Sequence, residues 1–366
     1  MSSHLTRRGS KSPLIERPPS ISQFPATRYQ GSKLRLLSWL WSELEPLDFD
    51  SCLDLFSGTS AVSYLLKVKG KRVAANDKYR FNAVIARALI ANNGVRLSPE
   101  RLEALGQREG EREYDDLVST LFEGLFFLPE ENQQIDVIAQ NIDAQLEGYE
   151  RALAFYALFQ ACLAKRPYNL FHRANLYMRT SEIKRSFGNK TTWDRPLQEH
   201  MRRALEAANA AVFDSGRSHE VFTSDFLEVP GTYDLVYMDP PYLNAQGTGV
   251  DYLDFYHFLE GLTEYDRWRE RVSLRYKHRP YQRDRENPWN DRRRILQAFD
   301  DAIGRYPNAI IAISYRSAGY PSVDELIAVL ERHARTALTT AATEHKYVLS
   351  TAKNREVLLL SGPAKR

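Results

Sequence analysis

Apolar residues near the start of the chain follow two alternating patterns, one typical of helices and one of short buried strands. The elements predicted from this alternation are a helix at residues 33–47, a strand at 52–56, a helix carrying Val62, Leu65 and Leu66, a strand at 72–75 and a helix from about Phe81. Strand, glycine-containing turn and helix in succession open a parallel α/β sheet. The pattern therefore predicts an α/β fold.

The same alternation returns in the second half of the chain. The elements predicted there are a helix at 197–212, strands at 221–222 and 233–237, a helix through 255–262, a helix at 295–303, a strand at 309–315, a helix from 323 or 324, and strands at 345–349 and 356–360. The last two strands flank a turn at residues 352–354 and are predicted to form a terminal hairpin.

Between these two regions the charge of the chain changes sign. Residues 101–150 look helical and solvent-facing, and 13 acidic residues there oppose three arginines. Residues 165–203 hold ten basic residues against three acidic ones, and residues 264–294 hold 11 against six, both interleaved with aromatic side chains. The whole-chain net charge of +3 hides this distribution. Basic, aromatic-rich stretches favour nucleic-acid binding over a merely solvated surface.

Composition narrows the class of protein further. The chain has 366 residues with 43% hydrophobic and 27% charged, enough for a large core and too apolar for wholesale disorder. Cys52 and Cys162 are its only cysteines, which excludes a disulfide framework and a paired-cysteine zinc site. No apolar run approaches the ~18 residues of a membrane span. We expect no metal, no membrane contact and a cytoplasmic location.

The tetrapeptide Asp239-Pro240-Pro241-Tyr242 directly follows a predicted buried strand and is the strongest functional signal in the chain. Two consecutive prolines fix the backbone and remove two amide donors. A carboxylate and a proline carbonyl held there can both accept hydrogen bonds from one exocyclic amino group, and the tyrosine ring can stack on the same flat molecule. The motif predicts a site for an amino-bearing aromatic base.

Three weaker motifs surround this one. The turn Asp54-Leu55-Phe56-Ser57-Gly58 lies at the predicted carboxyl edge of the sheet, where open α/β folds bind ligands. Asp77 ends the next strand, and its carboxylate suits a ribose diol. Lys33, at the start of the first helix, can face a ligand carboxylate. Taken singly, each of these residues is equally well explained as a helix cap or a turn residue.

In this order the motifs resemble those of the S-adenosylmethionine-dependent DNA adenine-N6 methyltransferases of the Dam-like alpha group. The resemblance spans roughly residues 24–361, and it departs from many relatives in having one glycine at the turn after residue 56. It implies a Rossmann-like class I methyltransferase sheet with a C-terminal antiparallel hairpin. It also implies the cofactor S-adenosyl-L-methionine, in a pocket lined by Tyr29, Lys33, Phe56, Gly58, Asp77, Asp225, Phe226 and Asp239. The target adenine would be held by Asp239, Pro240, Pro241 and Tyr242.

The resemblance also divides the chain. Residues 1–24 are expected to be a disordered basic tail, 25–94 and 221–366 the catalytic domain, and 95–220 an inserted, mostly helical target-recognition domain. The expected partner is double-stranded DNA with the target base flipped out, bound by Arg173, Arg179, Lys184, Arg185 and Lys190. A cognate restriction endonuclease would be a second partner, and a prokaryotic or phage protein near the nucleoid is expected.

Two alternatives stay open at the level of sequence. Cytosine-N4 methylation uses the same grip on an amino group, although such enzymes more often carry serine in place of Asp239. A catalytically silent DNA-binding regulator on this fold is the second, and the intact Asp239–Tyr242 motif disfavours it. RNA or a protein amide would be a more distant acceptor.

Overall fold

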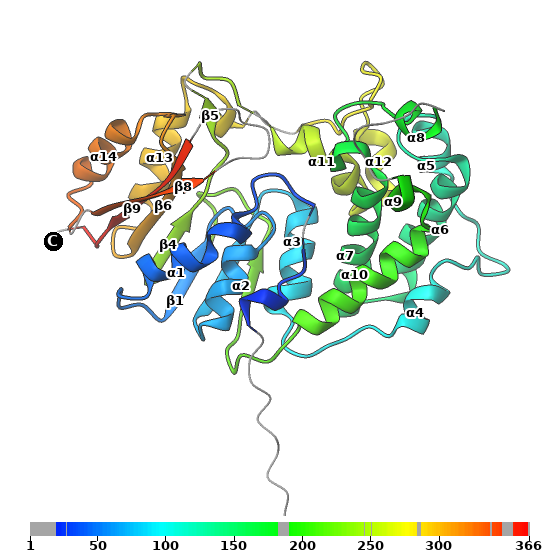
Figure 1. The fold of residues 1–366 in the computed structure, drawn as a ribbon, viewed down its shortest axis with the longest axis horizontal. Coiled ribbons are helices and arrows are strands. Elements are labelled where there is room, and N and C mark those ends of the chain that lie inside the picture. The colour runs from blue at the N-terminus through cyan, green and yellow to red at the C-terminus, as the bar shows by residue number, and fades with distance from the viewer. Residues whose placement is uncertain are drawn as a thin grey trace, which may run out of the picture.

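A computed structural model describes residues 20–26, 28–181, 190–244, 246–249, 251–283, 287–336, 339–345 and 354–364. These residues form a seven-stranded sheet in the order β3-β2-β1-β4-β6-β9-β8 (Figure 1). Its strands are β1 (Ser51–Asp54), β2 (Arg72–Asn76), β3 (Glu220–Phe222), β4 (Leu235–Met238), β6 (Ile310–Arg316), β8 (Thr339–His345) and β9 (Asn354–Ser361). The strands β3, β2, β1, β4 and β6 run parallel to one another, whereas β9 is antiparallel to both of its neighbours, β6 and β8.

Helices cover both faces of this sheet. One face carries α1 (Leu37–Leu44), α2 (Ala61–Val68) and α3 (Arg80–Ala86), and the other carries α13 (Ile295–Gly304) and α14 (Val323–Arg332). Successive strand residues point to opposite faces, so Leu358 and Leu360 of β9 join the first core while Val357 and Leu359 join the second. The result is a three-layer α/β/α arrangement. A separate antiparallel pair consists of β5 (Leu243–Asn244) and β7 (Gly319–Tyr320).

A helical part lies beside the sheet and extends the first core (Figure 1). Its helices are α4 (Pro99–Ala104), α5 (Leu117–Leu121), α6 (Pro129–Gln145), α7 (Gly148–Lys165), α8 (Tyr177–Thr180), α9 (Lys190–Asp194) and α10 (Leu197–Ala211). The central helix α7 packs against α6, α10 and α3 of the sheet part, and its residues from 152 to 165 are almost all buried. One continuous hydrophobic core therefore joins the helical part to the sheet.

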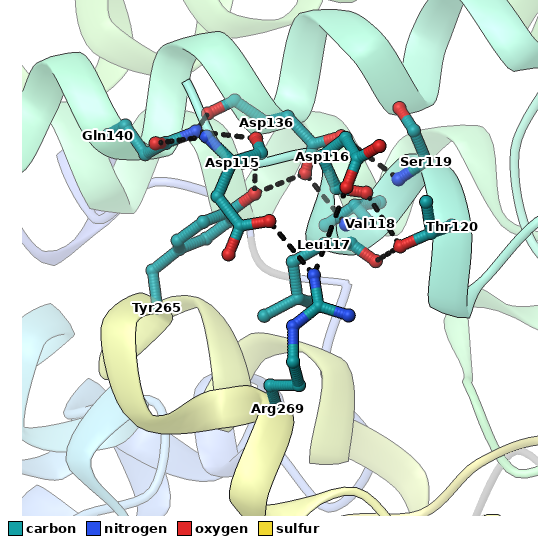
Figure 2. Close-up of polar contacts among 10 residues, drawn as sticks. All are labelled: Asp115, Asp116, Leu117, Val118, Ser119, Thr120, Asp136, Gln140, Tyr265 and Arg269. Atoms are coloured by element: carbon teal, nitrogen blue, oxygen red, sulfur yellow. Dashed lines mark hydrogen bonds and ion pairs between the residues drawn. The ribbon is translucent and has the colours of Figure 1, made fainter. Parts of the chain in front are cut away.

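Two helices from later in the chain also pack into the helical part. They are α11 (Tyr252–Leu262) and α12 (Tyr265–Arg271). The ring centroids of Phe258 in α11 and Trp268 in α12 lie 5.2 and 5.0 Å from the ring centroid of Phe122 in the helical core. Figure 2 shows the polar contacts between α12 and helices α5 and α6. The Asp136 carboxylate accepts the first amides of α5, and the Tyr265 hydroxyl donates to the same carboxylate.

Short helical turns complete the described structure. They are η1 (Ile21–Gln23), η2 (Lys33–Leu36), η3 (Arg87–Ala91), η4 (Pro167–Asn169) and η5 (Pro288–Asn290). The turn η1 falls within the predicted disordered tail, and Phe24 beside it is buried with its ring 5.1 Å from that of Tyr64. That prediction is wrong for residues 20–24, because an aromatic residue there packs on the sheet part. Residues 1–19 lie outside the described residues.

The predicted fold class is confirmed by the strand order and by the antiparallel hairpin of β8 and β9. The first hairpin strand, β8, covers residues 339–345 and meets the predicted strand 345–349 at His345. Residues 346–349 of that prediction and residues 352–353 of the predicted turn lie outside the described residues. The helices α11 and α12, which the sequence places in the catalytic part, pack on the helical core, and α11 also contacts α3 and Tyr29 of the sheet part. None of the helices described here is long and apolar enough to cross a membrane.

Candidate active site

The predicted motifs meet where the strand order of the sheet reverses. From β1 the chain forms β2 on one side and later returns to form β4 on the other side. Asp54 pairs in register with Tyr237, and the amide of Leu55 donates to the Tyr237 carbonyl at 3.0 Å. The turn containing Gly58 and the loop beginning at Asp239 therefore leave the same edge of the sheet, where ligands of open α/β folds bind.

Asp77 connects the end of β2 to the Gly58 turn. Its Oδ2 accepts a hydrogen bond from the Gly58 amide at 3.0 Å, and its Oδ1 accepts one from the Tyr79 amide at 2.9 Å. Gly58 has a φ of +49°, which favours glycine. Burial raises the pKa of Asp77, and the two amide hydrogen bonds oppose that rise. Each carboxylate oxygen keeps a second lone pair, so Asp77 is fixed in place and can still accept from a diol.

The segment from Tyr29 to Lys33 is held by tyrosines of α11. The Tyr29 ring stacks 4.4 Å from the ring of Tyr256 and 5.5 Å from that of Tyr252. The Tyr256 hydroxyl also accepts from the Gln30 amide at 2.8 Å. Gly31 has a φ of +81°, and a Cβ there would lie 2.5 Å from the Tyr252 hydroxyl. Both the backbone angle and the close approach require glycine at this position.

Phe56 and Phe226 share an aromatic cluster on the other side of the turn. Their ring centroids lie 6.4 Å apart, and Trp289 packs edge-on 4.9 Å from Phe56 and 5.1 Å from Phe226. The adjacent Asp225 is half-buried and lines a cavity of about 180 Å³ together with Tyr79. The predicted residues after β1, β2 and β3 thus lie around one edge of the sheet.

Lys33 and Asp239 form the centre of a buried polar network. The Lys33 ammonium lies 2.9 Å from Asp239 Oδ1, 3.0 Å from Glu356 Oε1 and 2.6 Å from the Tyr242 hydroxyl. The Tyr242 hydroxyl donates to Asp239 Oδ1, and the Ser314 hydroxyl donates to Glu356 Oε1 at 2.6 Å. The side chains of Lys33 and Glu356 are 5% and 0% exposed, so this network is internal.

Asp239 differs from its partners in being 17% exposed. Its hydrogen bonds and ion pair fall on Oδ1, and within the described part of the chain Oδ2 has no bonding partner. Burial raises the pKa of Asp239; Lys33 opposes that rise and Glu356 adds to it. The arrangement fixes one oxygen of the carboxylate and leaves the other open as an acceptor.

Residues 29–283 match the model of the D12 class N6 adenine-specific DNA methyltransferase family, which is more than half of the chain. The chain belongs to this family. It is an N6-adenine DNA methyltransferase, and the matched range includes the segments around Tyr29, Asp77 and Asp239. The resemblance inferred from the order of the motifs is thereby confirmed, and the comparisons give no support to cytosine-N4 methylation or to a silent regulator.

Several relatives of this family member are type II methyltransferases by name. The chain is 27% identical over 342 residues to the type II methyltransferase M2.HphI of Haemophilus parahaemolyticus, covering 91% of this chain and 95% of that protein. It is 26% identical over 333 residues to the type II methyltransferase M.FokI of Planomicrobium okeanokoites, covering 84% of this chain and 47% of that protein. The type II methyltransferase M.CviAII of Paramecium bursaria Chlorella virus 1 is 22% identical over 332 residues, covering 84% and 88%.

The structure gives Lys33 and Arg179 different surroundings from those predicted. Lys33 is predicted to face a carboxylate of the cofactor; its ammonium lies against Asp239 and Glu356 of the protein itself, and a contact with the cofactor stays a prediction. Arg179 was expected to bind DNA, but it is buried with its guanidinium 2.7 Å from both carboxylate oxygens of Glu131. The prediction for Arg179 is contradicted, because a buried, paired guanidinium does not face a phosphate.

Other basic residues of the stretch at 165–203 are internal as well. Lys165 lies 2.7 Å from Glu131, and Arg166 donates to the carbonyls of Phe126 and Leu170. Arg173 and Lys190 are exposed and remain predicted DNA contacts. Lys184 and Arg185 lie outside the described residues. Within the described part of the chain, no group of three or more His, Cys, Asp or Glu side chains is arranged to hold a metal.

Sequence reasoning missed Glu356, Ser314 and Trp289 as parts of this site. Glu356 and Ser314 lie on neighbouring strands, and Trp289 belongs to a loop before α13. One signal was available for Glu356, which shares the period-two face of Leu358 and Leu360 and is therefore a charged residue on a buried face. A carboxylate in that position requires a partner, and here the partner is Lys33.

Proposed function

We propose that this enzyme transfers a methyl group from S-adenosyl-L-methionine to N6 of an adenine flipped out of duplex DNA. The observation that carries the proposal is the state of Asp239, whose Oδ1 is held by Lys33 and Tyr242 while Oδ2 is open at the carboxyl edge of the sheet. An acceptor placed in this way, directly before two prolines, suits an exocyclic amino group.

The residues of the Asp239–Tyr242 motif would act on the acceptor nitrogen. The lone pair of adenine N6 is delocalised into the ring, which makes it a poor nucleophile. Hydrogen bonds from N6–H to Asp239 Oδ2 and to the Pro240 carbonyl would draw the nitrogen toward tetrahedral geometry and localise that lone pair. N6 loses a proton once it is methylated, and Asp239, whose pKa is raised by burial, is the nearest base. The rest of the catalysis is positioning.

The polar groups around the Gly58 turn support the assignment of S-adenosyl-L-methionine as the cofactor. Asp54 Oδ1, Ser57 Oγ, Ser60 Oγ and Asn82 Oδ1 are buried without a hydrogen-bond partner among the described residues. Such groups fit a polar ligand, since buried polar atoms are normally paired. Asp77 would accept from the ribose hydroxyls, and Phe56 and Phe226 would flank the base. When bound, the cofactor would supply a methyl group on a positively charged sulfur.

The DNA would lie across the edge of the sheet and the helical part. A base inside a duplex cannot reach Asp239, so the target would be flipped out at a cost of a few kcal/mol. We assign target recognition to residues 95–220, with Arg173 and Lys190 on phosphates. The type II relatives support a role in restriction and modification, with a cognate endonuclease as partner.

The test uses labelled methyl donor and duplex DNA with the wild-type enzyme and Asp239→Ala. We expect Asp239→Ala to transfer no label while it binds the duplex nearly as well as wild type. Asp234→Asn is the matched control, because Asp234 is a hydrogen-bonded carboxylate at the opposite end of β4, where it accepts from Ser51. An equal loss of transfer and binding in Asp239→Ala would show that Asp239 is structural and would refute the proposed role.

A further inference from the structure

Glu356 is a buried carboxylate whose role neither the family match nor the motifs assign. It lies on β9 at 0% exposure, directly opposite Arg316 of β6 and diagonal to Ser314. Ser314 and Glu356 occupy the same face of the sheet, and the Ser314 hydroxyl donates to Glu356 Oε1 at 2.6 Å. An ionised carboxylate is costly to bury unless it is paired, so its position is set by its partners.

The same oxygen of Glu356 reaches the candidate active site. Lys33 Nζ lies 3.0 Å from Glu356 Oε1 and 2.9 Å from Asp239 Oδ1, so one ammonium bridges two carboxylates. The Tyr242 hydroxyl, 3.3 Å from Glu356 Oε1, accepts from Lys33 at 2.6 Å and donates to Asp239. Lys33 and Tyr242 therefore both contact Asp239 Oδ1, and Glu356 Oε1 contacts both of them.

We propose that Glu356 is a positioning residue for methyl transfer, which holds the Lys33 ammonium and the Tyr242 hydroxyl on Oδ1 of Asp239 so that Oδ2 stays open to the amino group. The proposal rests on the proposed role of Asp239. Without the second carboxylate, the ammonium is free to move fully onto Asp239 and to bind the oxygen that the substrate needs. Glu356 touches neither base nor cofactor in this scheme and acts only through Lys33 and Tyr242.

The first test compares Glu356→Ala with Glu356→Gln and with the control Asp234→Asn. Alanine removes the hold on Lys33, and we expect kcat to fall about 100-fold, as a displacement of about 1 Å at a reacting group can cause. KM for DNA and for the methyl donor should change little. Glutamine keeps an oxygen that can accept from Ser314 and Lys33, so it should restore part of kcat. Asp234→Asn should keep the wild-type kcat.

The pH profile of kcat separates electrostatic positioning from simple packing. Glu356 contributes to the raised pKa of Asp239, so removing its charge in Glu356→Gln should move the acidic limb of the profile to lower pH. The other titratable groups that face Asp239 are Tyr242 from its own loop, Lys33 from η2, Tyr237 from β4, Tyr252 from α11 and Asp54 from β1. All five are unchanged in the variant, so the shift reports on Glu356.

A double-mutant comparison tests whether Glu356 acts through Lys33. If it does, Lys33→Met combined with Glu356→Gln should lose no more activity than Lys33→Met alone. If the losses of activity in the two single mutants add in the double mutant, the proposal is overturned. It is also overturned if Glu356→Ala keeps the wild-type kcat, or if Glu356→Ala has a raised KM for both substrates and an unchanged pH profile. Each of these results can occur while Asp239→Ala is inactive and wild type methylates adenine, so a failure here is distinct from a failure of the proposed function.

Discussion

Replacing Arg179 by methionine tests the finding that this arginine is internal. Its guanidinium donates to both oxygens of Glu131 at 2.7 Å and to the Trp193 carbonyl at 3.2 Å, and its side chain is 4% exposed. Methionine keeps most of the apolar stem and removes the charge. The exposed Arg173 in the same basic stretch is the matched control.

The size of the effect follows from what remains around Glu131. Removing one partner of a buried ion pair typically costs about 3–5 kcal/mol of stability. Lys165 stays 2.7 Å from Glu131 and the Leu128 amide also donates to it, so the carboxylate keeps compensation. We therefore expect Arg179→Met to lower the free energy of unfolding by about 3 kcal/mol, at the low end of that range. Arg173→Met should change it by less than about 0.5 kcal/mol.

Urea unfolding and the salt dependence of DNA binding give the two readouts. Arg179→Met should lower the urea midpoint and leave the slope of log K against log salt unchanged. Arg173→Met should keep the wild-type urea midpoint. If the Arg173 side chain contacts one phosphate, the substitution should reduce the slope of log K against log salt by about 0.9. The reasoning is refuted if Arg179→Met keeps wild-type stability and instead reduces the salt slope, since its guanidinium would then contact a phosphate.

Two further substitutions test the cofactor site and a buried histidine. Asp77→Asn should raise the KM for the methyl donor by roughly 10- to 100-fold, the equivalent of one lost charge-assisted hydrogen bond, without weakening DNA binding in a titration. His219 accepts from the Val73 amide, and burial together with nearby Lys67 lowers its pKa to about 4. Because protonation of His219 favours the unfolded chain, stability should be full above about pH 6.5 and fall by up to about 3 kcal/mol as the pH drops through 4. His219→Gln should remove that part of the pH dependence of the urea midpoint.

The centre of the sheet could be predicted because β1 and β4 are short, fully buried strands followed by chemically distinctive residues. Both β1 and β4 are buried at every position; β4 is apolar throughout, and β1 has Cys52 and Leu53 at its centre. The parallel pairing of these two strands then brings Gly58 and Asp239 to one edge of the sheet. The contact of Lys33 with Asp239 was not predicted, because the direction of a long side chain depends on partners far along the sequence. Glu356 is such a partner.

The basic stretch illustrates the limit of counting charges. Lys165, Arg166 and Arg179 contribute to the local excess of positive charge, yet all three are buried and bonded within the protein. Glu131, which neutralises two of them, belongs to the acidic stretch and lies 48 residues before Arg179. The opposite charges of the two stretches therefore partly cancel inside the helical part, which no local window of sequence can show.

The most direct measurement is the identity of the methylated nucleoside. Duplex DNA incubated with the enzyme and labelled methyl donor is digested to nucleosides, which are separated and counted. The open oxygen of Asp239 and the family assignment predict label in N6-methyladenine, and none in that product with Asp239→Ala. Label found only in N4-methylcytosine, or on no nucleoside of any DNA offered, would contradict the account.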